Sequence, residues 1–424
     1  MVLFGFLTKL AGIISSVIGI LAAYKMLMTI IGFFTTKQYP PAREYHSYAV
    51  AIAARNEEAV IGELIRSIQA QEYPKEKITV FVVADNCTDR TSEIAREMGV
   101  VCYERRDSQR RTKGWALRFL FEKIREDFRK DAFEGYFVFD ADNVLKQDFI
   151  ARMNEAFDAG EKVVVGYRNT KNFSDNWISA SYALHWLRTA RTEHRGRSAA
   201  GLSARVQGTG FLFAKEMVKD GWNYTSFTED RAFSADAVVK GVRIAYCDAA
   251  EFYDEQPVNL KIAARQRVRW AKGHLQSFGE SGAKLLKAAV KRRSIVCYDM
   301  FWTVVPENLV SWILRFSALV FGILALEERT QIKPLLLNYV RNFGMSCLGA
   351  SLMAAYVLLM ERNRIVQIPL MRKAWYCLLF PLFDLIGLFS TLYALFAKVE
   401  WKPIPHTARA TMEELEAARN EKHK

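Results

Sequence analysis

The sequence predicts an α/β fold in which a doubly wound, mostly parallel sheet is inserted between transmembrane helices. Two observations lead to this prediction. Between residues 40 and 298, short β-branched runs alternate with amphipathic stretches of helical period, which is the pattern of a sheet covered by helices on both faces. On either side lie long apolar blocks, each long enough to cross a bilayer as a helix.

Composition and charge narrow the class of protein further. The chain has 424 residues, and its 51% hydrophobic and 25% charged residues exclude both a disordered chain and a protein made only of membrane spans. Lys and Arg number 59 against 46 Asp and Glu, which gives a formal charge of +13. A membrane surface can account for this excess. Because the sequence has no zinc-ligand spacing, RNA-binding strand signature or isolated basic arm, we expect no nucleic-acid partner. The six cysteines have no paired spacing, so we expect free thiols in a reducing compartment.

Four apolar blocks predict membrane spans. The first covers residues 10–34, is too long for a signal-peptide core and lacks a small-residue cleavage site after it, so residues 1–36 are expected to form an N-terminal transmembrane helix. Residues 299–400 are expected to form three C-terminal transmembrane helices, at about 300–326, 337–360 and 374–399. The basic loop 361–373 predicts that this loop and the large middle segment are cytoplasmic, on the inner face of the plasma membrane. Four spans would place the tail outside, whereas Lys398, Lys402 and Arg409 favour the inside. The sequence therefore leaves open whether the number of spans is odd or even.

Several ionisable residues fall within the predicted spans. Charge at membrane depth either faces a polar pore or is neutralised inside the helix bundle, and the sequence alone does not choose between these. The residues are Glu307, Arg315, Arg341 and Asp384.

In the first half of the middle segment, three predicted strands end in polar clusters. Residues 48–54 form an apolar run that precedes a helix at about 60–68, and residues 78–84 form a β-branched run that precedes a helix at 91–98. A third apolar strand covers 136–139. Since ligands of such sheets bind beyond the carboxyl ends of the strands, the acids that follow these runs are expected to mark one rim of a site. These acids are Glu57, Asp85, Asp140 and Asp142.

Asp140 and Asp142 are candidate metal ligands. Two carboxylates one residue apart can hold Mg²⁺ or Mn²⁺ that bridges the oxygens of a diphosphate, although the same sequence also fits a solvated turn. Asp85 can accept a hydrogen bond from a ribose or a uracil, or can cap a helix. Lys113 can bind a phosphate or a base, or can belong to a solvated basic turn.

The second half of the middle segment holds three further motifs. Residues 207–210 form a loop of little bulk before an apolar run, where another molecule can approach closely. Residues 228–230 precede a helix and can either cap it or carry out acid–base chemistry. Residues 266–270 lie in a basic amphipathic stretch, from about 260 to 278, that also fits a helix lying on anionic lipid.

The order Asp-x-Asp, Thr-Glu-Asp and Gln-x-x-Arg-Trp resembles the processive family 2 glycosyltransferases, which synthesise cellulose, mixed-linkage glucan, hyaluronan and chitin. The resemblance implies a cytoplasmic catalytic domain of the GT-A type at 40–258, interfacial helices at 259–298, and a gating motif and charged tail at 401–424. It also implies roles for individual residues: Asp230 as general base, together with Thr228 and Glu229; Ala54, Glu57, Asp85, Lys113, Asp140, Asp142, Gln266, Arg267 and Arg269 in donor binding; and Gly208, Thr209, Gly210 and Trp270 in acceptor binding.

Two departures from the family pattern affect these expectations. Arg55 stands where the family usually has a tyrosine, which puts a base-stacking role in doubt. Residues 401–407 are similar to the gating loops of these synthases without matching them.

The expected function is therefore inverting transfer from a UDP-sugar, with glucose favoured, to a growing β-linked polysaccharide such as a cellulose-like or mixed-linkage glucan. Two enzymatic alternatives remain: a single transfer to a lipid acceptor, and a chitin-like or hyaluronan-like synthase that uses UDP-N-acetylglucosamine. A transporter or scaffold whose charged clusters are structural is the alternative from another class.

Overall fold

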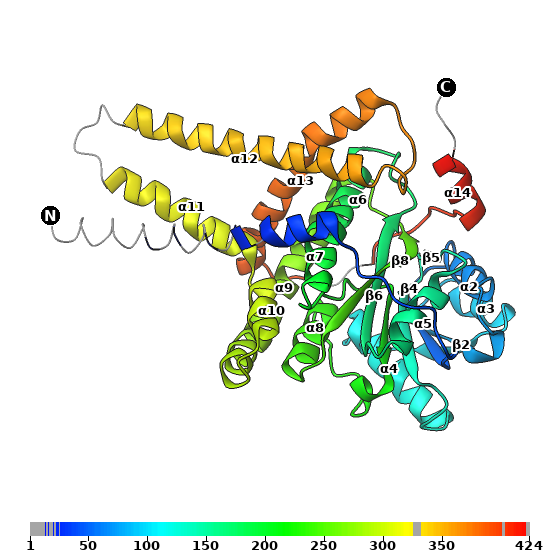
Figure 1. Cartoon of the computed structure of the whole chain (residues 1–424). Helices are drawn as coiled ribbons and strands as arrows, with labels where there is room; N and C mark the ends of the chain where they lie inside the picture. The colour runs from blue at the N-terminus through cyan, green and yellow to red at the C-terminus, as the bar shows by residue number, and fades with distance from the viewer. Residues whose placement is uncertain are drawn as a thin grey trace.

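The structure is a computed structural model that describes residues 13, 16, 20, 23, 24, 26–324, 332–400 and 403–420. Its centre is an eight-stranded sheet within these residues, with the strand order β3-β2-β1-β4-β7-β6-β8-β5. Helices cover both faces of the sheet, which confirms the α/β class (Figure 1). The strands are β1 (Tyr48–Ala54), β2 (Ile78–Asp85), β3 (Val101–Arg105), β4 (Gly135–Asp140), β5 (Val144–Leu145), β6 (Val163–Thr170), β7 (Phe211–Ala214) and β8 (Ile244–Asp254).

The sheet is mixed, so the prediction of a mostly parallel sheet is right only for part of it. β3, β2, β1 and β4 are parallel neighbours, as are β6 and β8. β7 is antiparallel to both β4 and β6, and β5 is antiparallel to β8. The chain enters β7 from the carboxyl edge of β4, where the amide of Gly210 donates to the carbonyl of Val138 at 3.0 Å, and it therefore runs back in the opposite direction.

The two faces of the sheet are covered by different helices. The strands alternate their side chains, so that Ala49 and Ala51 face one side while Val50 and Ile52 face the other. The first side packs against α4 (Lys113–Asp127), α6 (Trp177–Thr189) and α8 (Glu229–Val239), and the second against α2 (Ile61–Gln69), α3 (Thr91–Glu97) and α5 (Phe149–Asp158). Short helical turns lie at Lys75–Lys77 and Lys215–Val218, and a π-helix, Ala190–His194, joins α6 to α7 (Arg195–Ala199).

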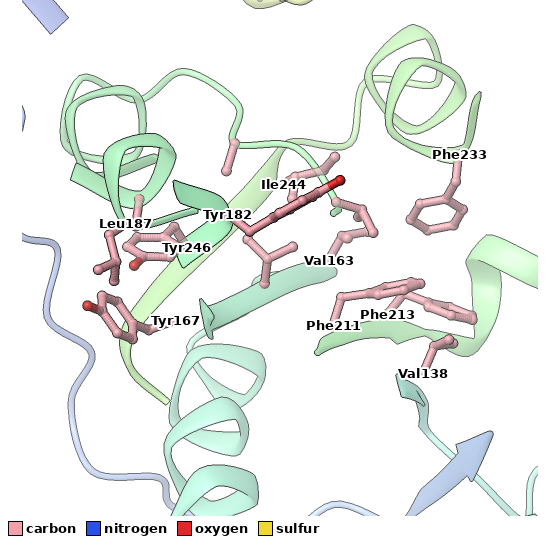
Figure 2. Close-up of a cluster of buried hydrophobic side chains, with 14 of the residues drawn as sticks. Val138, Val163, Tyr167, Tyr182, Leu187, Phe211, Phe213, Phe233, Ile244 and Tyr246 are labelled. Atoms are coloured by element: carbon pink, nitrogen blue, oxygen red, sulfur yellow. The ribbon is translucent and has the colours of Figure 1, made fainter. Parts of the chain in front are cut away.

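Aromatic rings dominate the first face. Phe211 and Phe213 of β7 lie beneath Phe233 of α8, and Trp222 stacks on Phe233 at 5.4 Å between ring centres (Figure 2). Offset stacked rings bury large areas in fixed orientations. They therefore hold the start of α8, where the predicted catalytic residues lie, at a defined place over the sheet.

A long helix, α9 (Leu260–Lys291), follows the sheet and extends well beyond the predicted amphipathic stretch. It packs against α8, α10 (Ile295–Val304) and α13 (Leu370–Phe396). Small residues allow the closest contact: a side chain at Gly273 would overlap Thr228 at the start of α8. The packing therefore brings α9, which carries the Gln-x-x-Arg-Trp motif, against the predicted catalytic residues at the start of α8.

The apolar segments differ from the predicted spans in one respect. The block at 300–326 is not a single helix, because α10 ends at Val304 and α11 (Glu307–Leu324) begins after Pro306. Proline has no amide hydrogen and disfavours helical geometry in the residue before it, and Val305 is extended, with ψ of 132°. Most of the predicted span at 10–34 lies outside the described residues, of which 26–34 are helical.

Two helices of the described part of the chain, α12 (Ile332–Met360) and α13, have the length and apolar composition that a bilayer span requires. α11 and α12 lie side by side and project away from the sheet (Figure 1). α13 is different, because its start contacts the loop after β6 and its end contacts α9. Tyr376 near its start donates to the carbonyl of Ser174 at 3.4 Å, and Lys272 of α9 donates to the carbonyl of Ala394 near its end at 3.1 Å.

The C-terminal segment returns to the sheet. Met412 and Leu415 of α14 (Met412–Asn420) pack against Val144 and Tyr253. Arg419 donates to the carbonyl of Asn363, which lies in the loop between α12 and α13. The described tail therefore lies on the same side of α13 as the catalytic domain.

Gly210 provides a test of this packing. Its φ is +66°, and a side chain would overlap the ring of Phe252, so Gly210→Ala is expected to destabilise the protein by about 3 kcal/mol through combined strain and overpacking. Gly160→Ala is the control, because Gly160 also has a positive φ of +94° but nothing lies within 4 Å; about 1 kcal/mol is expected there. Thermal unfolding in detergent compares the two variants. Equal losses would show that Phe252 does not constrain this turn.

Candidate active site

One cavity of about 690 Å³ lies at the carboxyl edge of the sheet and continues between α9, α11, α12 and α13. It gathers residues that are far apart in the sequence. Fourteen of the sixteen predicted site residues line it: Ala54, Glu57, Asp85, Lys113, Asp140, Asp142, Gly208, Thr228, Glu229, Asp230, Gln266, Arg267, Arg269 and Trp270.

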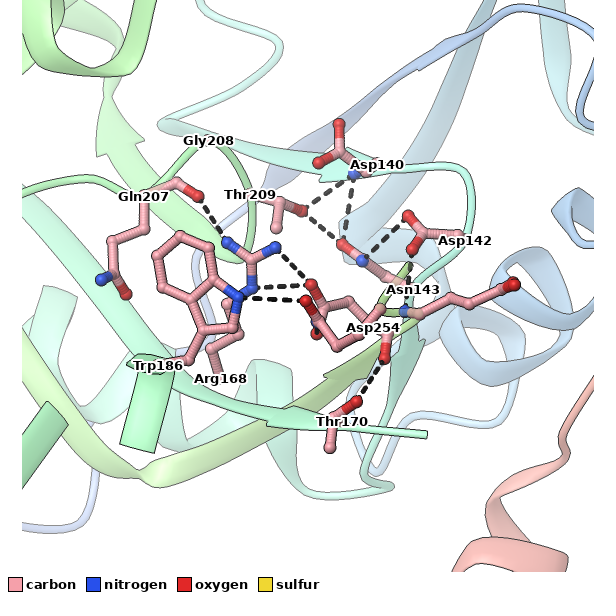
Figure 3. Close-up of polar contacts among 12 residues, drawn as sticks. Asp140, Asp142, Asn143, Arg168, Thr170, Trp186, Gln207, Gly208, Thr209 and Asp254 are labelled. Atoms are coloured by element: carbon pink, nitrogen blue, oxygen red, sulfur yellow. Dashed lines mark hydrogen bonds and ion pairs between the residues drawn. The ribbon is translucent and has the colours of Figure 1, made fainter. Parts of the chain in front are cut away.

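Asp140 ends β4, and Asp142 lies on the loop that follows it (Figure 3). The ammonium group of Lys113 donates to the Asp140 carboxylate and, at 2.8 Å, to the carbonyl of Gly208. Asp142 is buried, and its Oδ2 accepts from the amide of Glu255 at 2.9 Å. Burial works against ionisation of Asp142, but the nearby cations His406 and Lys171 hold its pKa below the usual value. Asp142 is therefore charged and able to bind a cation.

A divalent metal fits these residues only with help from a ligand. Among the described residues, no three His, Cys, Asp or Glu side chains are grouped closely enough to hold a metal ion. Mg²⁺ in nucleotide sites is commonly held by one or two carboxylates, with phosphate oxygens and water completing its octahedron. The two aspartates match that chemistry, in which the donor diphosphate provides the remaining oxygens.

Asp85 is enclosed by two guanidinium groups. Arg105 donates to its Oδ1 at 2.6 Å, and Arg55 donates to its Oδ2 and, at 2.9 Å, to its backbone carbonyl. The side chain of Asp85 is 5% exposed. Arg55, which departs from the family pattern, therefore acts as an ion-pair partner of the predicted nucleotide-binding aspartate.

The predicted catalytic acids lie at the start of α8. Gly208 faces Asp230, because a Cβ built on this glycine would lie 4.0 Å from Oδ2 of Asp230. Burial raises the pKa of Asp230, and burial together with the Asp230 charge raises the pKa of Glu229 to about 7. A carboxylate with a raised pKa is a stronger base, which suits removal of a proton from a hydroxyl.

The structure separates the two arginines of the Gln-x-x-Arg-Trp motif. Arg269 lines the same cavity as Glu229 and Asp140; burial lowers the pKa of Arg269, and the charges of these two acids oppose the shift. Arg267 points to α13, where its guanidinium lies 3.9 Å from the ring centre of Phe383. The expected donor-binding role therefore fits the position of Arg269 better than that of Arg267.

Two predicted acceptor residues, Thr209 and Gly210, are absent from the cavity wall. The hydroxyl of Thr209 accepts from the amide of Asp140 at 2.9 Å and contacts Asn143, so it shapes the Asp-x-Asp loop from behind. A glycine is required at position 210 because any side chain there would overlap the ring of Phe252. Thr209 and Gly210 thus contribute to packing, and Gly208 lines the cavity together with Gln207 of the same loop.

The C-terminal segment completes one wall, to which Pro403, Ile404 and His406 contribute. Nδ1 of His406 lies 3.0 Å from the carboxylate of Glu57, and the amide of Thr407 donates to Glu255 at 2.9 Å. Asp142 and Glu57 raise the pKa of His406 to about 10, against the effect of burial. Trp401, the first residue of the predicted gating motif, lies outside the described residues.

Comparison with known families supports this site. The profile described as "Glycosyltransferase like family 2" matches residues 46–273, which is more than half of the chain. The chain belongs to glycosyltransferase family 2. It is therefore an enzyme of the transferase class, and the matched region includes Asp140, Asp142, Asp230 and the motif at 266–270.

Two curated relatives illustrate the range of this family. A β-monoglucosyldiacylglycerol synthase of Nostoc sp. (strain PCC 7120 / SAG 25.82 / UTEX 2576) is 25% identical over 70% of this glycosyltransferase and 62% of its own length. A poly-β-1,6-N-acetyl-D-glucosamine synthase of Staphylococcus epidermidis is 25% identical over 52% of this chain and 53% of its own. The chain thus spans less than two thirds of these relatives.

The fold has a counterpart among solved structures. A mannosyltransferase, PcManGT from Pyrobaculum calidifontis, solved in complex with GDP-Man and Mn²⁺, superposes with a TM-score of 0.58 at 16% identity, covering 91% of this glycosyltransferase and 99% of that chain. This likeness shows a shared GT-A-like fold.

Among the described residues of the cavity wall, four polar side-chain atoms are buried without a hydrogen-bond partner. An unsatisfied buried polar group costs about 1–3 kcal/mol, so several around one space indicate that a polar ligand satisfies them. They are Gln207 Nε2, Thr228 Oγ1, Gln266 Oε1 and Arg267 Nη1.

The sequence analysis missed four residues that line the cavity near Asp142: Arg168, Trp186, Asp254 and Gln256. Asp254 ends β8, so the argument from strand ends would have found it if β8 had been recognised. Trp186 lies within α6 and Arg168 within β6, where no local signal marks them. Burial raises the pKa of Asp254 to about 6, with Arg168 opposing the shift.

The pKa of the catalytic pair predicts the pH dependence. If Asp230 must be ionised to act, activity falls as the pH drops through a pKa above the ordinary aspartate value, because burial raises it. Glu229→Gln removes a neighbouring negative charge. The fall in activity on the acidic side of the pH–rate profile, the acid limb, is therefore expected to move to lower pH, as measured by initial rates between pH 4 and pH 8. Glu216→Gln, at an exposed position outside the cavity, is expected to leave the limb in place. An unmoved limb in Glu229→Gln would argue against a coupled pair.

Proposed function

We propose that this enzyme is an inverting glycosyltransferase that transfers a hexose from a UDP-sugar, with UDP-glucose favoured, to a growing β-linked polysaccharide such as a cellulose-like or mixed-linkage glucan. The observation that carries the proposal is the single cavity: it joins the acids at the strand ends, the Thr-Glu-Asp motif and Trp270 to polar side chains on α11, α12 and α13. A donor, an acceptor and an exit path can thus share one space.

The chemistry follows from the positions of the charges. Asp230 takes the proton of the acceptor hydroxyl while that oxygen bonds to the anomeric carbon, and the bond from this carbon to the diphosphate breaks. Arg269 and Lys113 lie where negative charge develops on the departing diphosphate. A divalent cation, Mg²⁺ or Mn²⁺, held by Asp140 and Asp142 would neutralise further charge. The indole of Trp270 offers a flat apolar face for the acceptor sugar.

The inner faces of the apolar helices support a path for a polar product. Glu307, Ser311 and Arg315 lie four residues apart on α11, and all three line the cavity. Ser346 of α12 and Asp384 of α13 line it too. Many exposed side chains of α11 and α12 are apolar, which is expected of helices with lipid outside and a hydrophilic chain inside: Val310, Ile313, Phe316, Leu336, Leu337, Val340, Met345, Leu348 and Leu352. Asn338, Arg341 and Asn342 of α12 are exposed polar exceptions, and Arg341 donates to Asn338 at 2.6 Å.

The topology that we propose has an odd number of membrane crossings and would therefore place the tail on the cytoplasmic side. We place residues 1–34 and the hairpin of α11 and α12 in the plasma membrane, with α13 alongside the catalytic domain. Three crossings then keep the catalytic domain and the tail on the cytoplasmic side, in agreement with the positive charge of loop 361–373.

Transfer of a single sugar to a lipid acceptor is the second candidate. The relative named as a β-monoglucosyldiacylglycerol synthase favours it, as do the exposed apolar faces of the hairpin, which suit a lipid tail. The relative named as a poly-β-1,6-N-acetyl-D-glucosamine synthase favours polymer synthesis from an N-acetylhexosamine donor.

Product length separates these candidates. Membranes containing the enzyme are incubated with labelled UDP-glucose or UDP-N-acetylglucosamine, and the product is resolved by size and by extraction into organic solvent. We expect label from UDP-glucose in a polymer that a β-glucanase degrades. Label confined to an organic-soluble glycolipid would refute processive synthesis, and label from the N-acetylated donor alone would refute the choice of glucose.

Two aspartate variants separate the proposed roles. Asp230→Asn is expected to lower transfer at least about 100-fold because the base is lost, while UDP affinity stays within about twofold. Asp142→Asn is expected to weaken Mn²⁺-dependent UDP binding, measured by titration calorimetry with and without the metal. Asp131→Asn is the control, since this exposed residue lies outside the cavity. Near-normal activity of Asp230→Asn would disprove the assignment of the base.

A further inference from the structure

One buried ion pair lies in the wall of the cavity and is linked through neighbouring residues to Asp142, to the loop at residues 207–210 and to Trp270. Nε of Arg168, on β6, donates to Oδ2 of Asp254, at the end of β8, at 2.7 Å, and Nη2 donates to the same oxygen (Figure 3). Asp254 is 2% exposed. A buried ion pair is weak evidence for stability, since desolvation offsets most of the attraction, so its geometry is the more informative property.

The first connection reaches the donor side. Glu255 directly follows Asp254, and its amide donates to Oδ2 of Asp142 at 2.9 Å. Asp254 is itself fixed from the other side, because Nε2 of Gln256 donates to its Oδ1 at 2.6 Å. The position of the backbone after β8 therefore determines where the Asp142 carboxylate points.

The second connection reaches the glycine loop. Nη1 of Arg168 donates to the carbonyl of Gln207 at 2.9 Å. The next carbonyl, that of Gly208, accepts from Lys113, which also bonds Asp140. All three guanidinium nitrogens of Arg168 thus donate to protein atoms, so this arginine is arranged to hold its neighbours and not to bind the donor.

The third connection reaches the proposed acceptor platform. The guanidinium of Arg168 lies over the ring of Trp186, 3.9 Å from its centre, and Nε1 of Trp186 donates to Oε1 of Gln256 at 3.3 Å. Trp186 also contacts Trp270, with ring centres 5.5 Å apart and planes at 66°, and His185, with ring centres 4.9 Å apart. Tyr182 contacts Trp270 edge-on at 5.8 Å. Trp186 is thus clamped on one side and supports the indole of Trp270 on the other.

We propose that the Arg168–Asp254 pair is a positioning element that, through Trp186, sets the acceptor platform Trp270 relative to Asp142 on the donor side. This inference rests on the proposed function, because it takes Trp270 as the acceptor platform. The planar fork of arginine is required: a lysine can keep the charge but cannot stack on an indole while donating in three directions. Loss of alignment lets the donor react with water instead of the acceptor.

The test measures coupling between donor cleavage and transfer. Membranes with wild-type enzyme, Arg168→Lys or Trp186→Phe are given whichever labelled donor the wild type incorporates, and released UDP is compared with incorporated sugar. We expect both variants to keep UDP affinity within about twofold, and to release about tenfold more UDP per sugar incorporated, since small misplacements of reacting groups cost up to about 100-fold in rate.

Matched controls come from another stacked pair. Arg110 lies 4.7 Å from the ring centre of Trp115, and Trp115 is outside the cavity wall, so Arg110→Lys and Trp115→Phe repeat the substitutions away from Trp186. These controls are expected to keep the wild-type ratio of UDP to sugar. If Arg168→Lys does not fold, Trp186→Phe decides the question alone.

Trp270→Leu tests the acceptor role of Trp270 separately from the positioning role of Arg168 and Trp186. If Trp270→Leu transfers sugar with the wild-type ratio, Trp270 is not the acceptor platform and the proposed function loses that assignment. If Trp270→Leu uncouples cleavage from transfer but Arg168→Lys and Trp186→Phe do not, the positioning role is refuted while the platform stands. Uncoupling in all three supports the positioning element.

Discussion

The site depends first on the register of three parallel strands, whose carboxyl ends lie at nearly the same position along one edge of the sheet. In the register of the sheet, Ala54 of β1 pairs with Ala84 of β2, and Ala53 pairs with Asp140 of β4. β2 and β4 therefore each end within one residue of the end of β1, and the polar residues that follow the three strands must share one edge. The antiparallel β7 then brings the glycine loop to the same edge, because it can start only where β4 ends. Every later contact, including those of α9 and of the tail, is made to a rim that this register has already set.

The cavity is lined by equal numbers of basic and acidic side chains. Among the described residues that line it, eleven Arg and Lys face eleven Asp and Glu. A balanced lining offers many donors and acceptors without a net field, which suits the hydroxyl groups of a sugar; nucleic acid would require a basic surface. Within this lining the signs are separated: acids gather at the strand ends near Asp142, and arginines gather around α8 and α9. The chain's excess of +13 thus lies largely outside the cavity.

The sequence predicted those parts of the site that local order defines. Strand ends and the family resemblance carried by three ordered motifs were enough to identify fourteen residues of one cavity. Asp-x-Asp and Thr-Glu-Asp lie at element boundaries that periodicity reveals, whereas Gln-x-x-Arg-Trp lies inside α9 and was identified through the resemblance. The mixed sheet was not predicted, since the direction of β7 depends on which edge the chain enters from. The break at Pro306 had a local signal that the apolar composition around it concealed. The placement of Arg168 depends on the register shift after Gly166 in the pairing of β6 with β8, which no sequence pattern reports.

The contact between His406 and Glu57 spans 349 positions of the chain, and Arg409 donates to the carbonyl of Ala59 at 2.8 Å across a similar separation. Contacts of such long range form late in folding, because the intervening chain must first be ordered. Here the intervening chain includes the apolar hairpin of α11 and α12. The wall that His406 completes can therefore close only after α11 and α12 have been synthesised, so the order of synthesis places the apolar hairpin before completion of the cavity.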